Sequence, residues 1–477
     1  MADHSNVQAR WLRECLEQNR QTEYGRRWGF SQIDSIASYQ ARVPLVDYAD
    51  IETQILRIWE GAVDVLFQGQ PVAFECTGGS RGGAKRIPYT LESLEDFQKA
   101  VVPYLAWLHE NYGVEPSNSY WAISPIVREE RLSPAGIPVG VSDEQYLGLQ
   151  KQEGVVPEWV AQINQVQSWK IATLYWLIRA EKLRFISVWS PTFLLMLFAC
   201  IFTCRETLGA LLETGGTLWG KTLPADRAAN KRLDAFVRQQ DAAVLWPELQ
   251  LVSLWQDGLS APYADALKTF FPAIPFQPKG LISTESVVTM PDEEGVPLLA
   301  VQSGFFEFMN AEGIFLYDAL KTDQTYEVIV TTRGGLYRYR TGDVVRCDGY
   351  KNGRPILRFQ YREGIVSDMV GEKLTEAFVA KTLEDVAEFA MLVPDREARR
   401  YVLVLASGSR VDVRQIEQRL LRNPQYRYAR ELGQLHTLQA VYVDNALERY
   451  LASRNKAGQR MGDIKVPRLS TDETGWW

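Results

Sequence analysis

Apolar positions in the first half of the chain follow helical spacing around short continuous runs, which are typical of buried strands. An amphipathic helix is expected near residues 7–16. Residues 70–90 combine a short apolar strand, a glycine-rich loop and a second extended piece. Residues 91–108 have helical spacing, and Thr90 stands where a side chain that caps the helix N-terminus is expected. This mixture of helices and short strands predicts α/β architecture.

One apolar segment has about the length of a membrane span. Residues 185–204 carry no charge and are flanked by Arg184 and Arg205. Ser190 and Pro191 interrupt the segment, and β-branched residues before them favour a strand. We interpret the segment as a buried strand, a turn and a buried helix. A membrane-associated structural protein is the alternative, which cell fractionation would test.

The second half of the chain is richer in strand patterns. Strands are expected at residues 249–255, 280–290, 305–309, 327–332, 342–347 and 356–361, with a helix at 263–271. The last part has its own order: helix 375–389, strand 401–406, helix 412–421, strand 439–443 and helix 445–453. The predicted fold class is therefore α/β. A large N-terminal domain with mixed sheets and a small barrel-like part precedes a small α+β C-terminal domain.

Composition narrows the classes of function. The 477 residues are 46% hydrophobic and 23% charged, as in globular proteins, and a net charge of −7 leaves no broad basic field for nucleic acid or anionic lipid. Five scattered cysteines suit a reducing compartment. The three histidines lie far apart, so a His-based triad is not expected. With no secretory signal pattern at the N-terminus, we expect a cytoplasmic protein.

A glycine-rich loop is the first candidate site. Glycines let backbone N–H groups converge on an anion, hydroxyl groups donate to phosphate oxygens, and basic side chains add charge. The loop is not a Walker A motif, because no Ser or Thr follows Lys85 to bind Mg²⁺. A flexible surface turn is the alternative. The loop reads Thr77-Gly78-Gly79-Ser80-Arg81-Gly82-Gly83-Ala84-Lys85-Arg86.

Two acidic motifs are further candidates. Residues 280–286 predict a strand that ends in Ser283-Thr284-Glu285-Ser286, where a carboxylate beside hydroxyl groups suits a metal–nucleotide complex or, alternatively, a surface turn. Asp343 enters an apolar strand, where an unpaired carboxylate is costly. A ribose diol would satisfy it, and a salt bridge to Arg338 or Arg340 is the alternative.

Taken together, the order and spacing of the motifs resemble the auxin-responsive Gretchen Hagen family of acyl-acid amido synthetases. These enzymes are relatives of firefly luciferase and acyl-CoA synthetases in the adenylate-forming superfamily. The resemblance spans residues 74–468, and the bacterial-type members are closest in length. Its motifs are residues 77–88, Ser283-Thr284-Glu285, Tyr339-Arg340-Thr341-Gly342-Asp343, residues 367–374, Lys465-Val466-Pro467-Arg468 and residues 188–193.

The chain departs from the family pattern at three places. Gly78-Gly79-Ser80 stands where members usually have Ser-Gly-Thr, and Arg81 replaces a small hydroxyl residue. Tyr361 replaces the usual glycine before Arg362. These departures keep open the alternative of a non-catalytic nucleotide-binding relative.

The resemblance implies a ligase with two half-reactions. ATP and a carboxylic acid give an acyl-adenylate and pyrophosphate, and an amine, which is an amino acid in relatives, then displaces AMP. A thioester ligase that acts on CoA or a carrier protein is the alternative. The implied cofactors are ATP, as a substrate, and Mg²⁺. The expected partners are small molecules, with no nucleic acid and no membrane insertion, and the protein is expected as a monomer or weak dimer.

The resemblance also implies roles for single residues. Lys465 would neutralise charge between the carboxylate and the α-phosphate, Glu285 would hold Mg²⁺, Asp343 would fix the ribose, and Arg362 would contact the nucleotide. Further nucleotide-binding candidates are Thr77, Gly78, Gly79, Ser80, Arg81, Gly82, Gly83, Ser283, Thr284 and Tyr339. The acyl pocket would include Trp189, Ser190, Thr192 and Phe193, with Trp121 and Tyr120 as looser candidates.

The implied domain organisation has three parts. Residues 1–362 form the large adenylate-forming domain with the ATP and acyl-acid sites, residues 363–368 form a hinge, and residues 369–477 form a small mobile C-terminal domain. Superfamily members turn this last domain between the two half-reactions.

Overall fold

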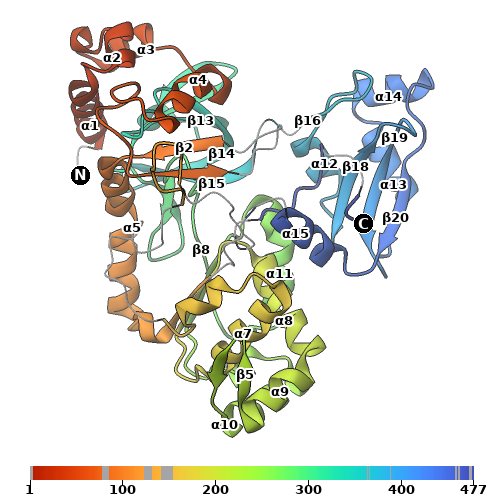
Figure 1. The fold of residues 1–477 in the computed structure, drawn as a ribbon. Coiled ribbons are helices and arrows are strands. Elements are labelled where there is room, and N and C mark those ends of the chain that lie inside the picture. The colour runs from red at the N-terminus through yellow and green to blue at the C-terminus, as the bar shows by residue number, and fades with distance from the viewer. Residues whose placement is uncertain are drawn as a thin grey trace. The chain divides into compact units, whose positions relative to one another are not determined.

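Figure 1 draws the computed structural model as a ribbon coloured along the chain. The chain divides into two compact units, which are described separately. The first comprises Met1–Asn111, Arg128–Lys151 and Pro278–Gln360, and the second comprises Tyr112–Val127, Gln152–Gln277 and Tyr361–Trp477. The structure describes residues 4–77, 85–122, 132–140, 154–362, 364, 366–386, 388–456, 459, 462, 464–471 and 475–477.

A seven-stranded sheet is the centre of the first unit. Its strands are β9 (Thr289–Pro291), β10 (Pro297–Leu299), β11 (Phe305–Asn310), β12 (Gly313–Leu316), β13 (Thr325–Thr331), β14 (Tyr339–Lys351) and β15 (Arg354–Arg362), in the order β12-β11-β13-β14-β15-β10-β9. The strands predicted at residues 305–309, 327–332, 342–347 and 356–361 are confirmed. The apolar core on this sheet includes Tyr39, Phe74 and Phe306, all fully buried.

Five helices belong to the N-terminal part: α1 (His4–Asn19), α2 (Glu23–Trp28), α3 (Ile36–Arg42), α4 (Tyr48–Trp59) and α5 (Leu91–Tyr112). The predicted cap of α5 is confirmed, because the Ser93 N–H donates to Thr90 Oγ1 at 3.1 Å. The Thr90 N–H in turn donates to Ser93 Oγ at 2.9 Å. These reciprocal bonds satisfy two of the N–H groups that a helix start would otherwise leave unpaired.

The strand expected at residues 280–290 is wrong in its first part. Only β9, which begins at Thr289, is a strand there. Gly280 has φ of +78°, and a Cβ at that position would lie 2.3 Å from the carbonyl oxygen of Thr289, so the chain bends sharply at this glycine. A turn follows at residues 283–286 in place of a strand end.

The second unit contains a four-stranded sheet in the order β3-β4-β7-β8. The strands are β3 (Ser119–Trp121), β4 (Phe185–Ser187), β7 (Leu251–Leu254) and β8 (Phe276–Pro278), and β4 pairs in parallel with both β3 and β7. The core on this sheet includes Trp169, Ile186 and Phe193. Helices of this part are α7 (Val166–Arg179), α8 (Pro191–Thr203), α9 (Arg205–Thr214), α10 (Arg227–Gln239) and α11 (Ala261–Lys268).

The uncharged segment at residues 185–204 has the predicted form. It is the buried strand β4, a bend at Trp189, and helix α8, which has Ser190 as its N-cap and Pro191 at its first position. Within the described residues no single helix has the length and apolar character of a membrane span. The pair α8 and α9 meets those criteria only together, with a bend of 75° between its members.

The C-terminal part of the second unit packs helices on a three-stranded sheet. Its strands are β18 (Ala390–Asp395), β19 (Arg400–Ala406) and β20 (Gln439–Val443), and its helices are α12 (Glu376–Thr382), α13 (Val413–Leu420), α14 (Pro424–Glu431) and α15 (Ala446–Lys456). The helix expected at residues 375–389 is wrong beyond Thr382, because β18 follows. Residues 383–385 form a turn after α12, and β18 begins at Ala390, so the chain leaves the helix one turn after Thr382 at the latest.

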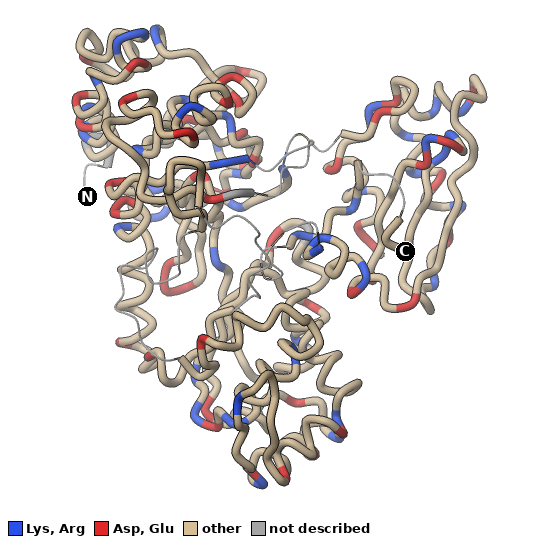
Figure 2. The backbone as a smooth tube through the Cα atoms, viewed as in Figure 1, with Lys and Arg blue, Asp and Glu red and all other residues tan. Residues whose placement is uncertain are grey.

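Acidic and basic residues are interspersed along the described parts of both units (Figure 2). Opposite charges therefore meet across elements that are distant in sequence. Arg57 pairs with Glu23 at 2.7 Å in the first unit, and Arg419 pairs with Asp385 at 2.5 Å in the second. Both pairs are partly exposed, so each contributes little to stability.

Candidate active site

A hairpin frames the glycine-rich loop of the first unit. Strands β1 (Ala73–Thr77) and β2 (Lys85–Tyr89) pair antiparallel, with Thr77 opposite Lys85. This confirms the two predicted extended pieces on either side of the loop. Residues Gly78, Gly79, Ser80, Arg81, Gly82 and Gly83 and the side chain of Thr77 lie outside the described residues, so their phosphate role stays a prediction.

Strand β2 contacts the Tyr-Arg-x-Gly-Asp motif at one end. Lys85 Nζ donates a hydrogen bond to the Tyr339 hydroxyl oxygen at 3.0 Å. The same ammonium lies 5.6 Å from the centroid of the Tyr48 ring and 5.7 Å from that of Tyr339, within reach of cation–π attraction. The loop hairpin and the first residue of β14 are therefore neighbours.

The other end of β2 contacts the Ser-Thr-Glu motif. The Tyr89 hydroxyl donates to the carbonyl oxygen of Thr284 at 2.5 Å. Ser283 closes the turn, because its N–H donates to the Ser286 carbonyl oxygen at 3.0 Å and its Oγ accepts from the Ser286 N–H at 3.3 Å. Glu285, inside this turn, is buried.

A small cavity of about 30 Å³ lies beside Glu285. The Ser286 hydroxyl oxygen on its wall is buried and makes no hydrogen bond within the described part of the chain. A buried hydroxyl in that state is available to a ligand oxygen. The wall also includes Ile87, Tyr89, Ser93, Asp96, Thr284, Ser303, Thr332, Arg333 and Gly334.

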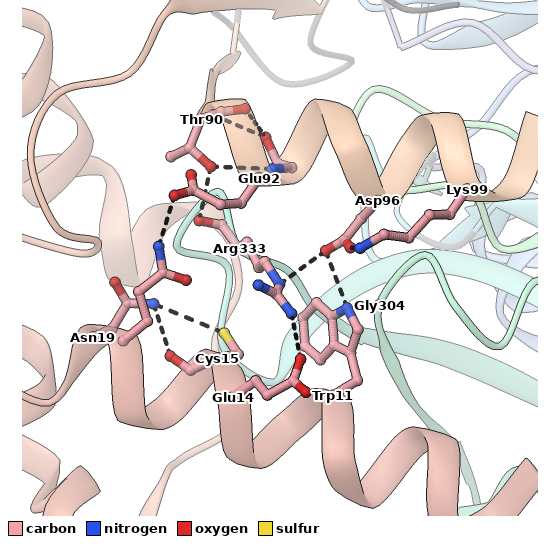
Figure 3. Close-up of polar contacts among 12 residues, drawn as sticks. Trp11, Glu14, Cys15, Asn19, Thr90, Glu92, Asp96, Lys99, Gly304 and Arg333 are labelled. Atoms are coloured by element: carbon pink, nitrogen blue, oxygen red, sulfur yellow. Dashed lines mark hydrogen bonds and ion pairs between the residues drawn. The ribbon is translucent and has the colours of Figure 1, made fainter. Parts of the chain in front are cut away.

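Asp96 and Arg333, which line this cavity, belong to an ion-pair network centred on the buried Asp96 carboxylate. Figure 3 shows its contacts. Arg333 pairs with Asp96 at 3.2 Å and with Glu14 at 3.1 Å, and its guanidinium carbon lies 5.3 Å from the centroid of the Trp11 ring. Asp96 also accepts from Trp11 Nε1 at 3.0 Å and from Lys99 Nζ at 2.8 Å. Burial raises the pKa of the Asp96 carboxyl, and these donors oppose the rise.

Sequence reasoning missed this network. Asp96 and Arg333 are far apart in the chain, and a helix pattern alone does not reveal that one of its carboxylates is buried. The network anchors residues 332–334 beside the cavity and joins them to α1 and α5.

Asp343 lies within an irregularity of strand β14, at residues 341–343. The register between β13 and β14 shifts between Glu327 and Ile329, which leaves extra residues on β14. Thr341 Oγ1 donates to the Val328 carbonyl oxygen at 2.8 Å and accepts from the Asp343 N–H at 3.0 Å. Gly342, with φ of +76°, permits the bulge. The bulge sets the orientation of Asp343, whose side chain is buried.

The neighbouring arginines have their own glutamate partners. Arg338 binds Glu307 through two hydrogen bonds of 3.0 Å, and both side chains are buried. Arg340 pairs with Glu327 at 2.6 Å. Arg338, considered from the sequence as a salt-bridge partner of Asp343, is thus engaged with Glu307 in the structure.

Three tryptophans mark the carboxyl ends of the parallel strands in the second unit. Trp121 ends β3, Trp189 lies two residues after β4, and Trp255 follows β7 directly. The ring centroids of Trp189 and Trp255 are 5.7 Å apart. The backbone N–H of Trp255 donates to the carbonyl oxygen of Trp189 at 2.9 Å. Ligands of open α/β sheets bind outside this edge.

Lys465 joins this aromatic group. Its Nζ lies 4.8 Å from the centroid of the Trp255 ring, and the side chain is exposed. Lys465 and Trp189, expected to act on the carboxylate and the acyl group, therefore contact one ring. Sequence reasoning missed Trp255, and the only available signal was its position at the end of a predicted strand.

The other acyl-pocket candidates have structural contacts in the described fold. Ser190 caps helix α8, because its Oγ accepts from the Thr192 N–H at 3.3 Å. Thr192 is buried, and Phe193 is fully buried with its ring centroid 5.7 Å from that of Trp169. Trp189 is only half-buried. Tyr120 is buried in the core of the same unit.

Arg362, the predicted nucleotide contact, is the last residue of β15 and is half-buried.

The fold is that of the adenylate-forming enzymes. A crystal structure of 2-hydroxyisobutyryl-CoA ligase in the postadenylation state has a TM-score of 0.54 at 12% identity, over 92% of this chain and 86% of the other. A structure of the GH3.15 acyl acid amido synthetase in complex with 2,4-DB has a TM-score of 0.83 at 21% identity, over 98% of this chain and 92% of the other. These likenesses confirm the predicted fold class.

The particular family follows from the sequence. A model of the GH3 family N-terminal domain matches residues 1–276, and a model of the GH3 family central domain matches residues 297–362. The chain belongs to the GH3 family, as the motifs predicted. Its relative indole-3-acetic acid-amido synthetase GH3.4 of Arabidopsis thaliana is 23% identical over 430 residues, which cover 80% of this chain and 71% of the relative.

Proposed function

We propose that this protein is an ATP-dependent ligase that adenylates a carboxylic acid and transfers the acyl group to an amine, most simply an amino acid. GH3 family membership supports the reaction class, since its named relatives are amido synthetases. One observation from the structure carries the proposal further. Strand β2 contacts Tyr339 at one end and Thr284 at the other, which brings three predicted nucleotide motifs together.

The nucleotide is proposed to bind along this hairpin. The loop at residues 78–83 would present N–H groups to the phosphates, and the buried Ser286 hydroxyl would donate to a phosphate oxygen. Asp343 would accept the two ribose hydroxyls, and Arg362 would contact the nucleotide. Bringing a carboxylate to a phosphate requires cations and oriented donors at the reacting centre, and Lys465 would supply one such cation.

Glu285 fits a role at a magnesium ion. Carboxylate oxygens are hard ligands that Mg²⁺ prefers, and this carboxylate borders the cavity. Among the residues that the structure describes, no group of three or more His, Cys, Asp or Glu side chains could hold a metal. Glu285 would hold the ion, which would supply positive charge beside the phosphates of ATP. When bound, it would neutralise phosphate charge.

The acyl group is proposed to lie against Trp189 and Trp255, whose aromatic faces suit a flat or apolar acid.

We also propose that residues 363–368 form a hinge between residues 1–362 and a mobile domain at residues 369–477. The protein is proposed to act in the cytoplasm on small molecules, as a monomer or weak dimer.

The experiment that tests this function is ATP–pyrophosphate exchange with Mg²⁺ and pooled aromatic, fatty and hydroxy acids. Exchange that depends on one pool supports adenylation and begins to identify the acid. Amino acids and CoA are then compared as acceptors by the rate of AMP release. Faster release with CoA alone would favour a thioester ligase, and ATP binding without exchange in any pool would favour a non-catalytic relative.

A further inference from the structure

The segment that carries Lys465 is attached to helix α12 by a buried carboxylate. Glu376 is the first residue of α12, and its two oxygens accept hydrogen bonds from the backbone N–H groups of Arg468 and Leu469, each at 2.7 Å. Glu376 and Arg468 are 92 residues apart in the chain. The bonds therefore fix a distant segment, and they do not cap the helix to which Glu376 belongs.

Arg468 strengthens this attachment with its own side chain. The guanidinium group is buried and donates to the carbonyl oxygens of Val386 (2.9 Å), Glu388 (3.2 Å) and Ala390 (3.2 Å). The backbone on both sides of Leu469 pairs with Leu392 of β18. The Leu392 N–H donates to the Arg468 carbonyl oxygen at 2.7 Å, and the Ser470 N–H donates to the Leu392 carbonyl oxygen at 2.8 Å.

This anchored segment begins three residues after Lys465. Ile464 and Val466 on either side of the lysine are buried, whereas Lys465 is exposed and lies over Trp255. The apolar neighbours and the clamp formed by Glu376 and Arg468 fix the backbone, so they set the position from which the ammonium group projects.

Burying the Glu376 carboxylate costs free energy, because a charged group is removed from water. Burial raises the pKa of Glu376 to about 7, although the two N–H donors and Arg468 lower it. A buried charged group is tolerated where it is fully hydrogen-bonded, and its removal leaves the partners unsatisfied. Both oxygens of Glu376 accept from backbone N–H groups that begin three residues after Lys465.

We propose that Glu376 and Arg468 are positioning residues that fix Lys465 for adenylate formation. The inference rests on the proposed function. Neither residue needs to touch the substrate, because each acts through the segment that carries the lysine. A displacement of about 1 Å at a reacting group can cost on the order of a hundredfold in rate, so the geometry of this segment matters.

The test compares two glutamine variants by pyrophosphate exchange, with the acid selected in the pooled screen. Glu376→Gln keeps the side-chain shape but replaces one acceptor oxygen with an NH₂ group, which cannot accept the second N–H. We expect exchange at least about tenfold slower, with ATP affinity within about twofold of the wild type by calorimetry. Hydrogen exchange, followed by mass spectrometry, should become at least about tenfold faster in the peptide that contains Arg468 and Leu469.

Glu417→Gln is the matched control. Glu417 is also a buried carboxylate of this C-terminal part, and it accepts from the Leu438 N–H at 2.8 Å and pairs with Arg430 at 2.8 Å. Those contacts do not include the Lys465 segment. If Glu417→Gln slows exchange as much as Glu376→Gln does, the effect is general destabilisation and the positioning role is wrong.

Arg468→Lys gives a second route if Glu376→Gln fails to fold. Lysine keeps the positive charge but has one ammonium nitrogen in place of the planar guanidinium fork, whose two terminal nitrogens bond to the three carbonyl groups. Slower pyrophosphate exchange with unchanged ATP affinity supports the clamp, and wild-type rates in the folded variants overturn it. Failure of the proposed function is distinct, because it appears as absence of exchange by the wild type with every acid.

Discussion

Buried carboxylates recur where this chain is proposed to act on its substrates, and each must be matched to a donor. Glu285, Asp343 and Glu376 are all nearly inaccessible to solvent. Glu376 finds its donors in the backbone of a distant segment. Asp343 lies in a bulge of strand β14. Its backbone N–H donates to Thr341 Oγ1, so the bulge orients the carboxylate through the main chain.

Asp343→Ala tests the ribose role. Charge-assisted hydrogen bonds contribute about 1.5–3 kcal/mol, so ATP affinity should fall roughly tenfold to a hundredfold. Isothermal calorimetry measures the affinity. Asp348→Ala is the control, because Asp348 lies on the same strand but pairs with Arg346 at 2.6 Å and Arg358 at 2.9 Å. Equal affinity in the wild type and Asp343→Ala would remove the ribose assignment.

Glu376 also predicts a pH dependence of stability. Its pKa is about 7 in the folded chain against 4.5 ordinarily, so the folded state binds this proton more tightly. The contribution of Glu376 to stability is therefore fully present below pH 4.5 and is lost as the pH rises through about 7. The slope is at most about 1.4 kcal/mol per pH unit for one group.

The Glu376→Gln variant has no proton to lose at this position. Between about pH 5.5 and about pH 7.5, urea unfolding should show a smaller loss of stability in the variant than in the wild type. Unfolding is followed by circular dichroism at each pH. Parallel pH profiles for the two proteins would contradict the raised pKa.

At the scale of elements, helix α5 connects the hairpin of the glycine-rich loop to the wall of the cavity. It begins directly after β2, and its second turn supplies Asp96 to the network with Arg333. The start of the helix depends on the two reciprocal bonds between Thr90 and Ser93. Loss of this cap should therefore affect the first turn before it affects the rest of the helix.

Thr90→Ala tests the cap. Replacing a capping Thr by Ala costs about 1 kcal/mol, which corresponds to roughly fivefold faster opening of the first turn. Hydrogen exchange of the peptide at residues 91–95 should show this increase. Thr203→Ala is a control. In the described part of the chain, the Thr203 hydroxyl bonds to carbonyl oxygens near the end of α8 and to Cys204, away from residues 91–95. The bond from the backbone N–H of residue 90 to Ser93 Oγ remains in this variant. An unchanged exchange rate at residues 91–95 would therefore mean that the Thr90 hydroxyl does not fix the helix start.

Whether a feature could be predicted from the sequence depends on how far apart its interacting residues are along the chain. Helix α5 with its cap and the strand–turn–helix at residues 185–204 were predictable, because the signals lie within a few residues of one another. The partners of Arg338 and Arg468 were not, because Glu307 and Glu376 lie 31 and 92 residues away. The motifs predicted which segments form the site. Residues that contact the site from other segments, such as Asp96 and Trp255, have no signal in the sequence around them.

At the scale of the whole molecule, the chain passes between the two compact units several times. Glu285 and Asp343 belong to the first unit, and Lys465, Trp189 and Trp255 belong to the second. In the described conformation, residues 361–477 belong to the same compact unit as residues 152–277. The proposed hinge at residues 363–368 follows Arg362 directly, and it contains Gly364, whose φ is +110°.

Gly364→Ala tests the hinge. A side chain in this backbone region costs about 1–3 kcal/mol, so the variant should restrict the conformations that the segment can adopt. If residues 369–477 turn between the half-reactions, the ratio of amide formation to pyrophosphate exchange should change at least about threefold. Single-turnover measurements of the two half-reactions give this ratio.

Gly408→Ala is the matched control. Gly408 also has positive φ (+89°), and, as at Gly364, no atom of the described residues beyond the glycine and its chain neighbours lies within 4 Å of the position that a Cβ would occupy. Both variants should lose similar stability, but only Gly364→Ala should alter the ratio, and an equal effect of the two would argue against a hinge at this position.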